Sequence, residues 1–183
     1  MRAGMLPRKV ALKDGRSVRL RVARRADARA TIDLVGAVAS ERVWYLVDRV
    51  TFTLKEEYAW LRKHRGGSEG IMIVAEEPGG RLVGNCSVTR EGFPKARHMA
   101  HLGIGMRKEY RGVGLGRELM LEAIAWARRA GVRKLTLQVF ASNTRAIRLY
   151  RVLGFKVDGI NRAHYKIRGR YTDNIHMALW LAS

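Results

Sequence analysis

The sequence predicts an α/β or α+β protein in which helices pack on one mixed sheet. Two observations carry this prediction. β-rich segments separated by short turns follow one another between residues 71 and 106, as expected of an antiparallel group. After residue 106 helices alternate with strands, and a glycine closes each helix. Because no repeat and no flexible linker interrupts the 183 residues, we expect a single domain over residues 1–183, with residues 1–16 as an N-terminal hairpin extension.

The first part of the chain predicts a hairpin and two helices. Apolar and charged residues alternate on both sides of the Asp14-Gly15 pair, so residues 10–22 predict a β-hairpin. Asp27 is placed to cap a helix that runs to about residue 40. Thr53 is placed to cap a second helix, in which apolar residues recur at helical spacing.

The later elements follow from the same two periodicities. We expect strands at 71–77, 81–89 and 97–106, a helix at 114–130, a strand at 134–140, a helix at 143–153, and strands at 155–160 and 175–181. In the helix at 114–130 the apolar residues form one stripe, and Glu118, Glu122 and Arg129 lie opposite it. These three charged residues are therefore expected to face away from the core.

Composition narrows the function classes and leaves a strong positive charge to explain. The chain has 36 Lys and Arg against 16 Asp and Glu, a formal net charge of +20. Such a charge suggests a polyanionic partner or a substrate with phosphates. A nucleic-acid or ribosome contact is one interpretation, and solvated arginine-rich faces are the other. The single Cys86 excludes an intramolecular disulfide and a zinc site of several cysteines, and we expect no metal.

Hydropathy indicates no membrane segment. No apolar run approaches the length of a membrane span, and residues 1–16 lack the apolar stretch of a signal peptide. We therefore expect a cytoplasmic protein without a membrane partner.

Residues 104–117 carry the strongest functional signal. A strand ends, a glycine-rich turn follows, and an apolar helix begins. Gly112, Gly114 and Gly116 leave backbone N–H groups uncovered at the positive end of this helix, which is suited to bind phosphate, and Arg111 and Arg117 add charge. Neither the P-loop nor the Rossmann glycine spacing is present. A surface turn that needs positive φ is the plainer alternative.

Two motifs together resemble the GNAT superfamily of acyl-CoA N-acyltransferases. The first is Arg111-x-x-Gly114-x-Gly116, similar to the family's pyrophosphate loop. The second runs from Asn143 to Phe155 and is similar to the family's Asn-x-x-Ala-x-x-x-Tyr-x-x-x-Gly-Phe. With the expected order of elements, the resemblance covers about residues 17–181. It implies a mostly antiparallel sheet with helices on both faces, splayed between strands 97–106 and 134–140 where the cofactor enters.

The resemblance also implies acetyl-CoA as the co-substrate and the residues that hold it. The pantetheine arm is expected along Ile104, Gly105 and Met106. The pyrophosphate is expected beside Arg111, on the amides of Gly112, Val113, Gly114, Leu115, Gly116 and Arg117. Asn143 and Tyr150 are seven residues apart, roughly 10 Å along one helix face, so they can touch different points of one extended arm.

The implied chemistry is direct attack of a primary amine on the thioester. Tyr150 would protonate the departing thiolate, and a backbone N–H near Met106 would polarise the carbonyl. Each residue has a plainer interpretation. Tyr150 shares its helix face with apolar residues and would suit a core position, and Asn143 would suit a helix N-cap, which is compatible with cofactor contact.

The proton acceptor for the amine is left open. Related ribosomal-protein Nα-acetyltransferases often carry the base in a Leu-Glu-Val segment, but the matching residue here is Gln138, which cannot accept a proton near neutral pH. Glu41 is the leading substitute, with pairing to Arg42 or Arg49 as the plainer alternative. His101 and Asp173 follow, and a water molecule is the remaining choice.

Two function classes therefore remain. The first is an acetyltransferase acting on a small amine, an amino acid, an antibiotic, or a protein N-terminus or lysine. The second is a non-catalytic module on the same fold that senses CoA or docks on nucleic acid or the ribosome. The sequence leaves the oligomeric state open, although dimers are common in the family.

Overall fold

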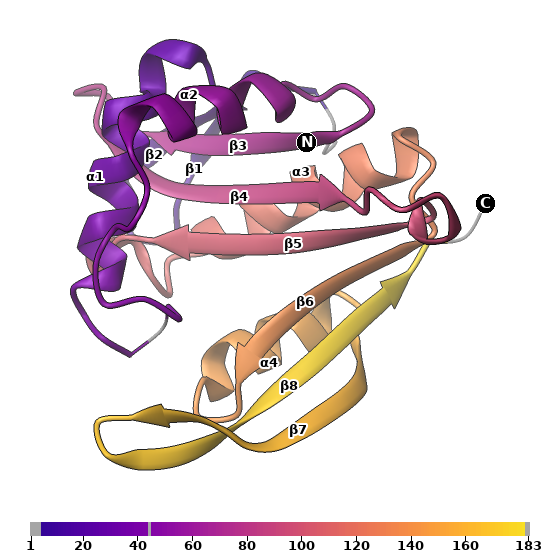
Figure 1. Cartoon of the computed structure of the whole chain (residues 1–183). Helices are drawn as coiled ribbons and strands as arrows, with labels where there is room; N and C mark the ends of the chain where they lie inside the picture. The colour runs from indigo at the N-terminus through magenta and orange to yellow at the C-terminus, as the bar shows by residue number, and fades with distance from the viewer. Residues whose placement is uncertain (1–4, 44, 182–183) are drawn as a thin grey trace.

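The computed structural model describes residues 5–43 and 45–181, in which eight strands form one sheet (Figure 1). The strands are β1 Arg8–Ala11, β2 Ser17–Val22, β3 Gly70–Glu76, β4 Leu82–Arg90, β5 Met99–Met106, β6 Lys134–Phe140, β7 Lys156–Ile167 and β8 Arg170–Trp180. The helices are α1 Ala28–Ala39, α2 Leu54–Lys63, α3 Leu115–Arg129 and α4 Thr144–Val152. The strand order is β1-β2-β3-β4-β5-β6-β8-β7, and β5 with β6 is the one parallel pair among the described strands.

Helices cover both faces of the sheet, because its central strands are apolar on both sides. Figure 1 shows α1 and α2 in front of the first strands and α3 behind them. Alternate residues of β3 face opposite layers: Met72 packs with Leu34 and Leu61 under α1 and α2, whereas Ile73 packs with Leu119 of α3. The expected mixed, mostly antiparallel sheet with helices on both faces is confirmed.

The sheet opens between β5 and β6. These strands pair only at three positions, from Met99 with Lys134 to His101 with Thr136, and then diverge (Figure 1). Beyond His101, the edge of β5 that faces β6 has no strand partner in the described residues, so backbone groups there are left for another molecule. This opening is the splay that the sequence resemblance implies.

Two helix caps are confirmed by hydrogen bonds. Thr53 Oγ1 accepts from the Glu56 N–H at 3.3 Å, and the Glu56 carboxylate accepts from the Thr53 N–H at 2.6 Å. This reciprocal arrangement anchors the start of α2. At α4, Asn143 Oδ1 accepts from the Ala146 N–H at 3.2 Å. Asp27 lies at the expected N-cap position of α1, but its side chain makes no cap hydrogen bond there.

Asp27 precedes α1, but its carboxylate is used elsewhere. It accepts from the Arg24 N–H at 2.6 Å and pairs with Arg21 at 2.7 Å. Arg21 is buried and also contacts Glu76, so the demand of a buried guanidinium for countercharge takes the Asp27 side chain away from the helix end.

Glu122 does not face away from the core as expected. It is 1% exposed, and its carboxylate lies 2.5 Å from Arg8, which also contacts Glu118 at 2.7 Å. The N-terminal extension places Arg8 over α3. The hydrophobic periodicity of α3 cannot predict this contact, because Arg8 is distant in sequence.

The last two strands are longer than expected. β7 and β8 include the basic segment 162–170 and join through Arg168 and Gly169, with φ of +48° and +81°. Positive φ at both central residues is typical of the tight hairpin turn. An Arg-Gly pair is a weak turn signal, so the sequence did not reveal this long hairpin.

Candidate active site

A cavity of about 1330 Å³ lies at the opening between β5 and β6 and extends to α1 and α2. It is lined by the free edge of β5, the glycine turn before α3, the start of α4, and the segment that joins α1 to α2. Ten of the expected site residues line it together with Glu41 and His101: Ile104, Gly105, Met106, Arg111, Gly112, Gly114, Gly116, Arg117, Asn143 and Tyr150.

The glycine turn forms an anion cradle. Gly114 is the N-cap of α3 with φ +96°, and Gly112 has φ +82°, so both adopt a backbone that other residues strongly disfavour. The backbone N–H groups of residues 112–116 donate to no group in the described part of the chain. Free amides at the positive end of a helix suit a pyrophosphate.

Two cations beside the cradle were missed by the sequence reasoning. The Arg145 guanidinium packs directly on the Cα of Gly112, where any side chain would collide with it. Lys13, from the N-terminal hairpin, lies over Gly114, and its N–H donates to the Val113 carbonyl at 3.0 Å. Arg145 lies within the second motif, so the sequence could have indicated it. No sequence pattern predicts that Lys13 lies near the turn.

Arg111 does not stand free in the anion site. Its two terminal nitrogens lie 2.6 and 2.7 Å from the Glu41 carboxylate oxygens, and it also donates to the Met106 carbonyl at 2.9 and 3.1 Å. The partner of Glu41 is thus Arg111 rather than Arg42 or Arg49. This pair ties the end of α1 to the strand that borders the opening.

The position of Tyr150 is compatible with both interpretations given to it. The side chain is buried on α4 and packs with Phe155, yet it lines the cavity. Burial, with smaller effects of Cys86 and Tyr45, raises the pKa of its hydroxyl above the usual value. The hydroxyl therefore keeps its proton at neutral pH.

Other expected residues lie differently. Val113 and Leu115 do not line the cavity, and their side chains pack against the core above the sheet, which leaves only their backbone for a ligand. Gln138 lines the cavity and accepts from Asn174 at 2.8 Å. Asp173 lies outside the lining, where the Ala163 N–H and Arg162 hold its pKa below the usual value.

His101 lies on β5 at the point where β6 departs. Loss of hydration there lowers the pKa of its imidazole, which favours the neutral form. His101 thus retains the capacity to accept a proton near neutral pH.

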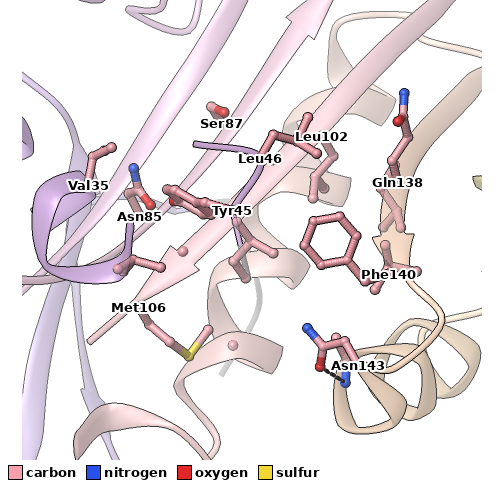
Figure 2. Close-up of a pocket in the computed structure, with 18 of the residues that line it drawn as sticks. Val35, Tyr45, Leu46, Asn85, Ser87, Leu102, Met106, Gln138, Phe140 and Asn143 are labelled. Carbon is pink, nitrogen blue, oxygen red and sulfur yellow. Dashed lines mark hydrogen bonds between the residues drawn. The ribbon is translucent and has the colours of Figure 1, made fainter. Parts of the chain in front are cut away.

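The segment between α1 and α2 inserts side chains into the cavity. Figure 2 shows Tyr45 and Leu46 over the strands, beside Asn85 and opposite Phe140 of β6. The Tyr45 hydroxyl packs on the Cα of Gly105, and burial raises its pKa to about 12. Gly105 is thus a glycine because a Cβ would displace Tyr45.

Two buried polar side chains on α1 and α2 also line the cavity without partners. Glu57 is 5% exposed and Thr31 is 2% exposed. Glu57 Oε1 and Thr31 Oγ1 form no hydrogen bond within the structure. Neither residue stood out in the sequence, where Glu57 reads as one more charge on a surface helix.

Neither a metal centre nor a membrane helix is found in the described ranges. Residues 5–43 and 45–181 contain no group of three or more His, Cys, Asp or Glu placed to hold a metal. Over the same residues, no helix is long and apolar enough to cross a membrane.

Comparison with known families identifies the class of protein. A profile of the Acetyltransferase (GNAT) family matches residues 37–155, from the end of α1 to the end of the second motif. The chain belongs to this family.

Curated relatives match over part of their length. N-alpha-acetyltransferase RimI of Mycobacterium tuberculosis is 37% identical over 97 residues, which are 52% of this chain and 59% of the relative. L-amino acid N-acetyltransferase AaaT of Escherichia coli is 30% identical over 103 residues, which are 54% of this chain and 62% of the relative. The matches thus span about three fifths of these two relatives.

Solved structures match over almost their whole length. A GNAT acetyltransferase from Streptococcus pneumoniae has a TM-score of 0.84 and 28% identity, covering 90% of this chain and 99% of its own. An acetyltransferase from Salmonella typhimurium, solved with its cofactor acetyl-CoA, has a TM-score of 0.81 and 26% identity, covering 91% and 95%.

Proposed function

We propose that the chain transfers an acetyl group from acetyl-CoA to a primary amine. The observation that carries the proposal is the juxtaposition, in one cavity, of free amides at residues 112–116, the unpaired edge of β5, and the Tyr150 hydroxyl. The first suits a pyrophosphate, the second an extended amide-bearing arm, and the third a leaving thiolate.

The described residues fit CoA. Its pyrophosphate would accept from the amides before α3, with Arg145, Lys13 and Arg117 as countercharges. Its pantetheine amides would pair with β5 beyond His101, as an added strand does. Asn143 already caps α4 through Oδ1, which leaves its Nδ2 as the donor for the arm.

Tyr150 would act as the general acid. The amine nitrogen forms a bond to the acetyl carbon, the carbon–sulfur bond breaks, and the thiolate takes the Tyr150 proton. The raised pKa keeps this proton in place until the sulfur leaves. The nitrogen loses a proton to His101 or to a water molecule in the cavity.

Glu41 has a different part in this proposal. Both of its oxygens are held by Arg111, so its geometry suits positioning better than proton transfer. We assign it the orientation of Arg111, and through Arg111 of the Met106 carbonyl at the end of β5.

Thiol release from acetyl-CoA across a panel of amines tests the proposal. The panel contains N-terminal peptides, lysine peptides, amino acids, aminoglycosides and polyamines. It includes α-amines and amino acids because the two relatives are named an N-alpha-acetyltransferase and an L-amino acid N-acetyltransferase. We expect turnover with one class. Acetyl-CoA binding without turnover on any amine would instead favour a CoA-sensing module, and no binding would overturn the cofactor assignment.

A further inference from the structure

We propose that Glu57 and Thr31 form a second subsite of the cavity, which binds a cationic group of the acceptor away from the reacting nitrogen. The acceptors best suited to it are diamines and polyamines. The inference rests on the proposed acetyltransferase function and names its substrate class.

The two side chains are suited to bind a ligand that donates hydrogen bonds. Glu57 and Thr31 come from neighbouring helices, are 5% and 2% exposed, and line the same cavity. Each has an oxygen without a partner. A buried polar atom left without a hydrogen bond costs about 1–3 kcal/mol, so two such atoms in the lining of one cavity favour a ligand that donates hydrogen bonds to them.

The charge of a ligand that suits this subsite follows from the rest of the chain. Arg and Lys outnumber acidic residues by 36 to 16, yet Glu57 is in no ion pair of the described residues. Most of the other carboxylates have a cation: Asp14, Asp27, Asp33, Glu41, Asp48, Glu76, Glu77, Glu109, Glu118, Glu122, Asp158 and Asp173. A buried carboxylate kept apart from so many cations leaves room for one from outside.

Three charged groups on the segments that pack against α2 have partners of their own. On α1, Asp33 pairs with Arg107; on β3, Glu76 pairs with Arg21. Arg25, before α1, lies over the Tyr58 ring. Burial is accordingly the one cause that raises the pKa of Glu57, to about 7. Near neutral pH the carboxylate is thus readily charged by a cation that binds beside it.

The position under α2 separates this subsite from the reaction. α2 packs over β3, where Met72 also lines the cavity. Met72 pairs in register with Ser87 of β4, and Ser87 with Gly103 of β5. Two strand spacings of about 4.8 Å place β3 roughly 10 Å from the β5 edge. A cation at Glu57 is therefore a second charge, joined to the reacting amine by a flexible chain.

The apolar lining of the cavity suits an alkyl chain. Val35 and Val38 of α1 belong to this lining, as do Phe52, which precedes α2, and Trp60 of α2. Trp60 is held by stacking on His64, with ring centroids 3.6 Å apart. An apolar wall with one carboxylate at its end selects a molecule that is apolar in the middle and positive at the end.

Steady-state kinetics with matched amines test the proposal. Butylamine is compared with a series of diamines from propane-diamine to octane-diamine, in wild type, in Glu57→Gln and in the control Glu69→Gln. Glu69 is an exposed carboxylate outside the cavity, so both variants change charge equally. We expect Glu57→Gln to raise KM for the preferred diamine about tenfold to a hundredfold and to leave kcat and the butylamine KM unchanged.

The pH dependence gives a second readout. In wild type the ratio of the diamine KM to the butylamine KM should rise as the pH falls from 8 to 6, because protonation removes the Glu57 charge, and this rise in the ratio should vanish in Glu57→Gln. Equal effects on butylamine and diamines, or no effect of Glu57→Gln, would overturn the proposal. If Glu57→Gln fails to fold, Thr31→Val replaces it, with the same selective rise in KM expected at smaller size.

Calorimetry separates this inference from the acetyltransferase proposal. Diamine binding to the wild-type chain that is lost in Glu57→Gln would support the subsite even if no amine is acetylated. Turnover of diamines with unchanged KM in Glu57→Gln would overturn the subsite and leave the transferase intact.

Discussion

In the proposed function, the cofactor end and the acceptor end of the cavity are built in opposite ways. The cofactor end would consist of contiguous segments, residues 104–117 and 143–150, whose backbone would do most of the binding. The acceptor end is assembled from α1, α2 and the segment between them, and side chains that are far apart in sequence, such as Thr31 and Glu57, define it. A backbone site leaves a motif in the sequence, whereas a side-chain site leaves single residues that look ordinary until the chain is folded.

Removal of the Tyr150 hydroxyl is expected to have the largest effect and tests whether the cofactor end needs a side chain for catalysis. We expect Tyr150→Phe to lower kcat by about a hundredfold to a thousandfold, with acetyl-CoA affinity nearly unchanged. Tyr110→Phe is the control, because that buried hydroxyl donates to Glu77 and does not line the cavity. Single-turnover kinetics measure the effect. A wild-type rate in Tyr150→Phe would show that Tyr150 is a core residue without a catalytic role.

Adding one methyl group to the glycine turn tests whether the backbone of the cofactor end binds acetyl-CoA. Gly112→Ala should weaken acetyl-CoA binding about tenfold to a hundredfold, because a Cβ there displaces Arg145 and strains the turn. Gly131→Ala has the same positive φ, at +70°, with nothing near its Cβ. Both variants should lose about 1 kcal/mol of stability, and calorimetry should find weaker binding only in the first. Equal affinities would contradict the cradle.

At the acceptor end, the burial of Glu57 should make the free energy of unfolding depend on pH. Burial raises the pKa of Glu57 to about 7, so the folded state binds this proton more tightly than the unfolded state. The resulting stability is present below the ordinary pKa of about 4.5 and is lost as the pH rises through 7.

The free energy of unfolding should therefore decrease between pH 5 and pH 8 by about 2 kcal/mol less in Glu57→Gln than in wild type. Urea unfolding of both proteins at several pH values measures the difference, in which other titrating groups cancel. Parallel pH curves for wild type and variant would show that Glu57 is not desolvated.

The smallest expected effect concerns Lys13, which the N-terminal hairpin places beside the glycine turn. Lys13→Gln should weaken acetyl-CoA binding about threefold to fivefold at low salt and less at high salt, because exposed charges are screened. Lys9→Gln, on the same hairpin and exposed, should change nothing. Salt-independent loss in both variants would mean that the hairpin acts through folding.

Sequence reasoning recovered what local pattern determines. The caps at Thr53 and Asn143 and the glycine turn all follow from residues near one another in the chain, whereas the opening between β5 and β6 was implied by the family resemblance. It failed where distant residues decide: Arg8 buries Glu122 on α3, and Arg21 takes the Asp27 carboxylate from the helix end. The Glu57 subsite was invisible for the same reason, since only packing of α2 on the sheet makes that carboxylate differ from Glu56 beside it.

The contact of Glu41 with Arg111 has a thermodynamic consequence. It joins the end of α1, on the acceptor side, to the β5 carbonyl at Met106, on the cofactor side. In the proposed function, both ligands would then lie beside one bidentate pair. If the acyl donor changes the affinity for the amine through this pair, the amine must change the affinity for the donor by the same factor. A double-titration experiment on this chain would thus yield a single coupling constant, and Glu41→Gln should bring it towards one.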